Sequence, residues 1–116
     1  MAFETAFTMD TSSIKYGPGV TREVGHDMKE LGTRRVMVVT DPNLTKSQPV
    51  AVTLDSLRLA GVDAVLFDQS SVEPTDVSFK EAVRFAKDGK YDGYVAVGGG
   101  SSMDTCKAAN LYATHP

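Results

Sequence analysis

The residues best suited to binding an anion form a run of three glycines and two serines between an apolar segment, 94–97, and an alanine-rich segment, 103–113. The run consists of Gly98, Gly99, Gly100, Ser101 and Ser102. Where a buried strand meets a helix, free backbone N–H groups and the helix dipole attract anions, and glycines let a diphosphate approach the backbone. The spacing matches neither G-x-G-x-x-G nor the P-loop, so the run predicts a phosphate site by its position alone.

Ser101 and Asp104 have two interpretations, which the spacing leaves open. Ser-x-x-Asp directly before a helix forms a capping box, in which each side chain satisfies a backbone donor. The same two residues are also placed to contact a bound dinucleotide, and the two roles are compatible. Because a carboxylate repels phosphates, a ligand role for Asp104 belongs near the nicotinamide end of the dinucleotide.

Asp41 lies just past a second apolar run, 36–39. In an open α/β sheet, ligands collect at the carboxyl ends of strands beside the topological switch, where Asp41 would face the glycine run and accept hydrogen bonds from a ribose diol. The sequence Asp-Pro-Asn is also typical of a turn, so a purely structural role for Asp41 stays open. A ribose contact would favour NAD over NADP, since a carboxylate repels the 2′-phosphate.

Two further residues with reactive side chains are weaker candidates. Cys106 lies in the first turns of the last expected helix, where the dipole could activate a thiol, but a small apolar residue packed on the sheet is the favoured interpretation. His26 lies on the polar side of the first expected helix, which is typical of a solvated imidazole.

Three apolar runs that alternate with amphipathic segments must position these residues. Strands are expected over 36–39, 64–67 and 94–97, and helices over 20–31, from about Val50 to Gly61, from Thr75 to Gly89 with Phe79, Ala82, Val83 and Ala86 buried, and from Met103 to about Ala113. Strands separated by helices imply parallel pairing through right-handed crossovers. The fold class is therefore α/β, a Rossmann-like parallel sheet (a βαβαβ half), preceded by a small β-hairpin within 5–16 and the first helix.

Composition and charge argue against several other classes of protein. The chain has 116 residues, 41% apolar, with 12 basic and 15 acidic side chains and a net charge of −3, as expected of one globular domain without a nucleic-acid-binding surface. No apolar run approaches the roughly 18 residues of a membrane helix, and the first residues lack the pattern of a transit peptide. A three-stranded sheet has an open edge, so residues 1–116 are expected to be a truncated amino-terminal dinucleotide-binding domain.

With these motifs placed, the chain resembles the amino-terminal domain of the iron-containing alcohol dehydrogenases, and within that family the hydroxyacid–oxoacid transhydrogenase branch. The similarity spans the whole chain, and segments 9–19 and 100–112 carry it nearly residue for residue. It implies a two-domain enzyme that holds NAD(H) on this side of a cleft. A divalent iron would be held by one Asp and three His in a carboxy-terminal helical domain that has no counterpart in this chain.

The resemblance also implies roles for individual residues. In the family, the aspartate at the position of Asp41 contacts the adenosine ribose, the loop at Gly98–Gly100 embraces the pyrophosphate, and the aspartate at the position of Asp104 lies by the nicotinamide. Many relatives carry Pro-Asn-Pro where this chain has Glu73-Pro74-Thr75, so the resemblance does not imply the adenine contact of that loop for this chain.

The activity implied by the resemblance interconverts 4-hydroxybutyrate and succinate semialdehyde, coupled to 2-oxoglutarate and 2-hydroxyglutarate. The expected partners are thus small hydroxy and oxo acids, without nucleic acid or membrane, in a full-length homo-oligomer in the mitochondrial matrix. The alternative, from a different class, is a non-catalytic α/β module whose glycine loop binds a nucleotide or phosphate and regulates a partner.

Overall fold

The computed structural model of the chain describes residues 19–70 and 76–114. In these residues, strands β1 (Arg35–Val39), β2 (Asp63–Phe67) and β3 (Gly93–Ala96) form a parallel sheet in the order β2-β1-β3. The helices are the short 3-10 helix η1 (Val20–Glu23), α1 (Val24–Glu30), α2 (Gln48–Leu59), α3 (Asp76–Gly89) and α4 (Gly100–Thr114). The predicted α/β class is confirmed, whereas the predicted hairpin within 5–16 lies outside the described residues.

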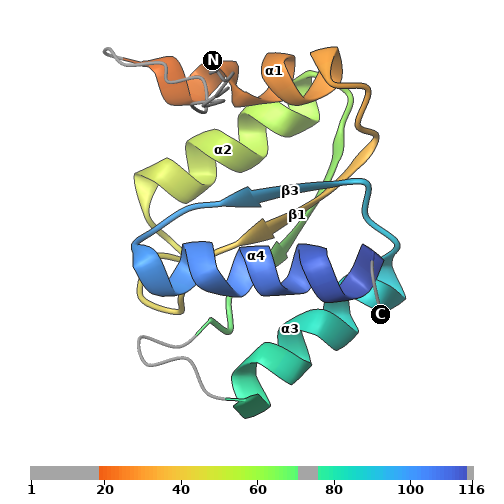
Figure 1. The fold of residues 1–116 in the computed structure, drawn as a ribbon. Coiled ribbons are helices and arrows are strands. Elements are labelled where there is room, and N and C mark those ends of the chain that lie inside the picture. The colour runs from red at the N-terminus through yellow and green to blue at the C-terminus, as the bar shows by residue number, and fades with distance from the viewer. Residues whose placement is uncertain (1–18, 71–75, 115–116) are drawn as a thin grey trace, which may run out of the picture.

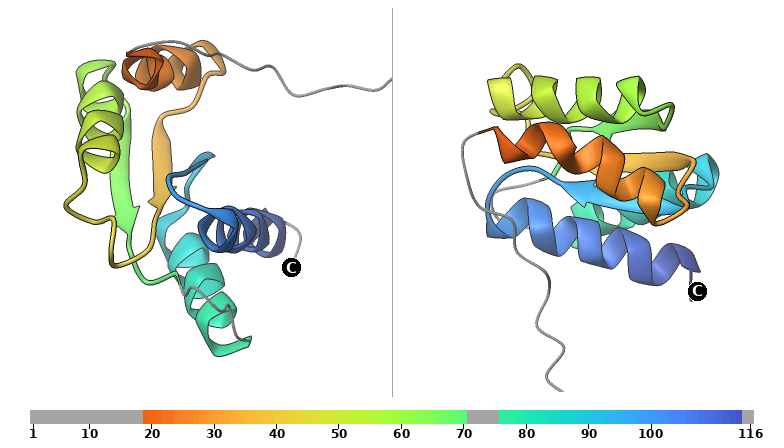
Figure 2. Two further views of the ribbon diagram at one scale, coloured as in Figure 1. Left: turned by 90° about the vertical axis from the view of Figure 1, so that its left-hand side faces the viewer. Right: turned by 90° about the horizontal axis from the view of Figure 1, so that it is seen from above.

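Helices cover both faces of the sheet, with α1 and α2 on one face and α3 and α4 on the other (Figure 1). Figure 2 shows the same three layers from two other directions. None of the described helices is both long enough and apolar enough to cross a membrane.

The central strand β1 explains why the sheet needs both helical layers. Its side chains alternate between the two faces, as they must in an extended strand. Val36 and Val38 pack with Leu57 of α2, whereas Met37 and Val39 face the opposite layer. That second layer comprises Phe67, Ala82, Ala86, Tyr91, Cys106 and Ala109. Residues 36–39 are fully buried, which is why this strand shows a continuous apolar run rather than alternation.

Glycines in the left-handed conformation end two of the predicted helices at the predicted positions. Gly32 has φ +83° after α1, and Gly61 has φ +81° after α2. The predicted end of α3 at Gly89 is confirmed, and the next residue, Lys90, adopts the left-handed φ of +53°. Gly89 is required for a different reason: a Cβ there would lie 2.2 Å from the Tyr91 ring.

At the amino ends of the strands, Asp92 joins the segment before β3 to the start of β1. Its carboxylate accepts hydrogen bonds from the backbone N–H of Arg35 at 2.9 Å and of Arg34 at 3.0 Å. These N–H groups hold the pKa of Asp92 below its ordinary value, because they stabilise the charged form.

Asp92→Ala is therefore expected to lower the free energy of unfolding at pH 7 by about 1 kcal/mol, a small value because the carboxylate is exposed. A lowered folded-state pKa stabilises the fold above the ordinary Asp pKa, and the contribution disappears as pH falls through the folded-state value. Urea unfolding at pH 7 and pH 3 checks this. The difference between wild type and variant should shrink at pH 3, and an equal difference at both values would contradict it.

Candidate functional site

The order β2-β1-β3 creates a topological switch point at the carboxyl ends of β1 and β3. From β1 the chain crosses one face through α2 to β2, and then returns across the other face through α3 to β3. The two strand ends are joined directly, since Val97 N–H donates to the Val39 carbonyl at 2.9 Å and Thr40 Oγ1 donates to the Val97 carbonyl at 2.8 Å. The segments that follow leave the same edge of the sheet, at the left of Figure 1.

The structure brings the glycine run and the segment of Asp41 together at this edge. An ideal Cβ on Gly98 would lie 3.3 Å from Leu44 Cδ1, so the segment that follows Asp41 contacts the first glycine. Both segments extend from adjacent strands at the switch point, which is where ligands of open α/β sheets bind.

The glycine turn, residues 98–100, has the properties of a phosphate cradle. Gly98 has φ +143°, which favours glycine, whereas an added Cβ on Gly99 or Gly100 would meet no atom within 4 Å. All three residues are exposed. The first bond of the helix runs from Met103 N–H to the Gly99 carbonyl, so the amides before Met103 have no acceptor within the helix. Amides without helical acceptors at a helix start, beside exposed glycines that leave room for a ligand, fit a pyrophosphate.

Helix α4 begins at Gly100, three residues before the predicted start at Met103. Ser101 is consequently the second residue of the helix, so the capping-box interpretation of Ser101 and Asp104 is wrong. Glycine is unfavourable inside a helix, but at the first positions the amides need no partner and Gly99 is an acceptable N-cap. Asp104 lies exposed in the second turn.

Asp41 has the turn role that its neighbours in the sequence suggest. Its Oδ1 atom accepts hydrogen bonds from Asn43 N–H at 2.8 Å and Leu44 N–H at 3.1 Å, which fixes the turn after β1. The other carboxylate oxygen, Oδ2, takes no part in these bonds. The ribose contact stays a prediction, and it is compatible with the turn role because the two use different oxygens.

Sequence reasoning missed a set of buried hydroxyls beneath the glycine turn. Thr40 and Ser70 follow β1 and β2, and they are 0% and 1% exposed. Ser102, predicted as a ligand, is also fully buried, and its hydroxyl lies 3.1 Å from that of Ser70. Because Ser102 is fully buried, a ligand in the open space does not reach its hydroxyl. The available signal was weak, because Thr40 directly follows an apolar run but Ser70 and Ser102 lie three and five residues past the ends of theirs.

The described residues do not fit a metal centre. Among them, no group of three or more His, Cys, Asp or Glu side chains is placed to hold a metal ion. The exposed His26 lies on α1, as predicted for a surface imidazole.

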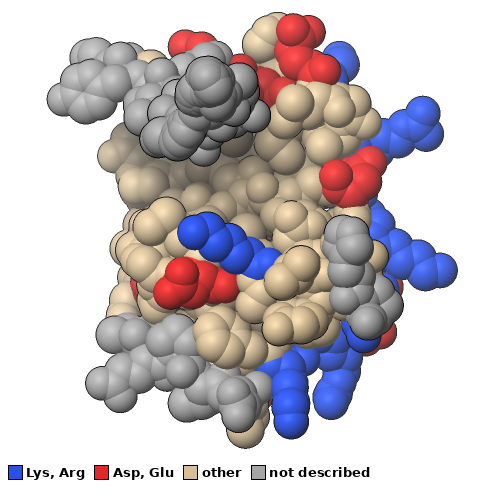
Figure 3. All heavy atoms as spheres, in the orientation of Figure 1, with Lys and Arg blue, Asp and Glu red and all other residues tan. Residues whose placement is uncertain are grey.

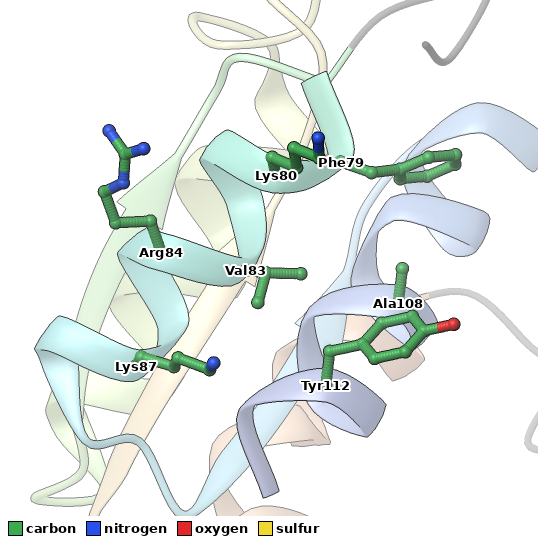
Figure 4. A pocket seen from close by; sticks show the side chains of 7 residues that line it. All are labelled: Phe79, Lys80, Val83, Arg84, Lys87, Ala108 and Tyr112. Carbon is green, nitrogen blue, oxygen red and sulfur yellow. The ribbon is translucent and has the colours of Figure 1, made fainter. Parts of the chain in front are cut away.

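A separate groove of about 1020 Å³ lies between α3 and α4 rather than at the strand ends (Figure 4). It is lined by Phe79, Lys80, Val83, Arg84, Lys87, Ala108 and Tyr112. Phe79 and Val83, predicted to be buried, are only half-buried, because α3 and α4 diverge and leave this groove open. Figure 3 shows basic side chains at the lower edge of the molecule, over α3, and further basic side chains in the middle and along the right-hand edge of the same face, where acidic ones also lie. None of the predicted site residues lines the groove.

Cys106 is a packing residue, as predicted. It is 8% exposed among Met37, Val39 and Ala109, and burial raises the pKa of its thiol to about 11. At pH 8 roughly one thiol in a thousand would be ionised. The native protein is therefore expected not to react with Ellman's reagent at pH 8, whereas the urea-unfolded protein releases one equivalent. Equal labelling rates in the two states would contradict this placement.

Comparisons with known proteins agree with this architecture. A sequence profile of iron-containing alcohol dehydrogenases matches residues 11–116. The chain is 56% identical over 111 residues to the mitochondrial hydroxyacid-oxoacid transhydrogenase of Homo sapiens, covering 96% of this chain and 24% of that protein. It is 47% identical over 117 residues to a probable mitochondrial hydroxyacid-oxoacid transhydrogenase of Dictyostelium discoideum, covering 96% and 21%. The chain thus spans about a quarter of the length of these relatives.

Solved structures show the same fold. An NADH-dependent butanol dehydrogenase of Thermotoga maritima superposes with a TM-score of 0.87 at 27% identity, over 94% of this chain and 28% of that one. An archaeal alcohol dehydrogenase from a Red Sea brine pool gives 0.85 at 30% identity, over 93% and 27%. From the profile match, the high identity to the transhydrogenases and the shared fold, it follows that this chain belongs to the iron-containing alcohol dehydrogenase family.

Proposed function

We propose that residues 1–116 are the amino-terminal, dinucleotide-binding domain of an oxidoreductase that acts on CH–OH groups, and that they bind NAD(H). The observation that carries this proposal is the glycine turn at the switch point, where Gly99 and Gly100 leave open space above free amides. The bound dinucleotide supplies the acceptor or donor of a hydride. The residues of this chain bind the dinucleotide, orient it and select NAD over NADP.

The pyrophosphate, the adenosine ribose and the nicotinamide end of the dinucleotide each have a matching group in this arrangement. The amides at the start of α4 bind the pyrophosphate, aided by the positive end of the helix dipole. Asp41 Oδ2 accepts hydrogen bonds from the adenosine ribose while Oδ1 holds the turn. Asp104, one turn further along α4, lies toward the nicotinamide end, where its charge does not oppose the phosphates.

The names of the relatives point to a reaction between hydroxy and oxo acids. We infer that the substrate pair is 4-hydroxybutyrate and 2-oxoglutarate, giving succinate semialdehyde and 2-hydroxyglutarate. We infer that the iron of the family is held in a carboxy-terminal domain; the described residues hold no group of three or more His, Cys, Asp or Glu side chains placed for a metal ion. The relatives are named mitochondrial, which supports a mitochondrial location, and we infer a full-length homo-oligomer in the matrix. The match to an enzyme family favours this function over a non-catalytic module.

Titration with NADH and NADPH, followed by nicotinamide fluorescence, tests the proposal. Wild type is expected to bind NADH at least about tenfold more tightly than NADPH, since Asp41 opposes a 2′-phosphate. Asp41→Asn keeps an oxygen for the turn amides but removes the charge, so it should reduce that preference toward unity without unfolding the loop. Binding of neither dinucleotide by the wild type would contradict the function, and an unchanged preference in the variant would contradict the ribose role.

A further inference from the structure

A chain of buried hydrogen bonds lies directly beneath the glycine turn and connects the ends of all three described strands. Ser70 Oγ donates to the Thr40 carbonyl at 2.9 Å and lies 3.1 Å from Ser102 Oγ. Thr40 Oγ1 in turn donates to the Val97 carbonyl at 2.8 Å. The segments after β1, β2 and β3 are thereby tied to one another at the edge where the ligand is proposed to bind.

The direction of the Ser70–Ser102 hydrogen bond follows from counting protons. A serine hydroxyl has one proton, and Ser70 gives its proton to the Thr40 carbonyl. Ser102 must therefore donate to Ser70 Oγ. Because Ser102 is fully buried, removing the Ser70 hydroxyl would leave the Ser102 donor without an acceptor.

Ser102 transmits its position to the glycine turn. A Cβ on Gly98 would lie 2.8 Å from Ser102 Oγ, so this hydroxyl packs against the Gly98 backbone. Ser102 is also the third residue of α4, in the first turn of the helix, whose amides have no acceptor within the helix. A hydrogen bond that fixes the Ser102 side chain therefore also fixes the Gly98 backbone and the first turn of α4, the two segments that border the proposed phosphate site.

We propose that Ser70 and Ser102 are positioning residues that hold the amides of the glycine turn in the geometry for a pyrophosphate. Neither hydroxyl touches the ligand. A cradle held in place before binding loses less freedom on binding, and small displacements of its donors weaken charge-assisted hydrogen bonds. This inference rests on the proposed function, since it concerns the same phosphate site.

The test measures dissociation constants for NADH, ADP-ribose and adenosine, with melting temperatures, in full-length Ser70→Ala, Ser102→Ala and the double variant. Each single variant should weaken NADH and ADP-ribose about fivefold, the factor equivalent to about one hydrogen bond. Because the two hydroxyls act through one bond, the double variant should lose little more than the single ones. Adenosine, which lacks the pyrophosphate, should bind all four proteins with the same affinity.

Ser56→Ala is the matched control. Ser56 is also a buried serine, but it lies away from the glycine turn and bridges two backbone groups. It accepts a hydrogen bond from Gly25 N–H at 2.9 Å and donates one to the Arg22 carbonyl at 2.5 Å. This variant should lower the melting temperature and leave NADH affinity unchanged.

Three results would overturn the inference: unchanged NADH affinity in Ser70→Ala and Ser102→Ala, equal weakening of adenosine and ADP-ribose, or equal weakening of NADH by Ser56→Ala. In each case NADH binding by the wild type would leave the proposed function standing. Failure of the wild type to bind NADH would overturn the proposed function together with this inference.

Discussion

Gly100→Ala is expected to weaken NAD binding at least about tenfold, equivalent to about 1.4 kcal/mol, while the protein folds as well as the wild type. The added Cβ would occupy the open space above the turn and push the pyrophosphate away from the amides. Each of those charge-assisted hydrogen bonds is worth roughly 1.5–3 kcal/mol. Isothermal titration with NAD and thermal melting of the same sample give the two quantities.

The structure makes Gly100 a clean position for this test. Its φ is outside the left-handed region, and a Cβ there meets nothing within 4 Å, so alanine introduces no strain. At a helix start the substitution should even stabilise the fold slightly, by about 0.4–1 kcal/mol.

Gly98→Ala is the contrasting variant, because its φ of +143° and a contact of 2.8 Å with Ser102 Oγ predict loss of folding as well as binding. Unchanged NAD affinity in a well-folded Gly100→Ala protein would remove the role assigned to the turn.

Residues 1–116 produced alone are expected to catalyse no hydride transfer from 4-hydroxybutyrate to NAD, even with ferrous iron. Between residues 19 and 114, outside the gap at 71–75, no cluster of side chains can hold the metal that would polarise the alcohol. NADH absorbance in the presence of protein, NAD, iron and substrate measures the rate against a blank without protein. Turnover well above that blank would contradict the separation of dinucleotide site and metal site.

The strands and most helix ends are predictable from the sequence because their signals are local. Burial on both faces of β1 requires apolar side chains at every position from 36 to 39, and the run is visible without the fold. Gly32 and Gly61 mark helix ends because glycine, which has no Cβ, avoids the steric penalty of the left-handed conformation. The end of α3 at Gly89 is predictable too, although the left-handed residue that follows it, Lys90, carries a side chain.

The site is only partly predictable, for two physical reasons. Glycine has a low helix propensity, so the sequence places the start of α4 after the glycine run, whereas the first helical positions tolerate glycine. The hydrogen bond between Ser70 and Ser102 joins residues 32 positions apart, and nothing in the local pattern links them. Position after a strand does identify Asp41 and the glycine turn, because parallel strands bring their carboxyl ends to one edge.

A crystal structure of the full-length protein with NADH tests the central claim most directly. We expect pyrophosphate oxygens within about 3 Å of the backbone nitrogens at Gly99 and Gly100, with the adenosine ribose at Asp41 and the nicotinamide toward Asp104. A dinucleotide whose pyrophosphate lies away from these amides, for example in the groove between α3 and α4, would contradict it.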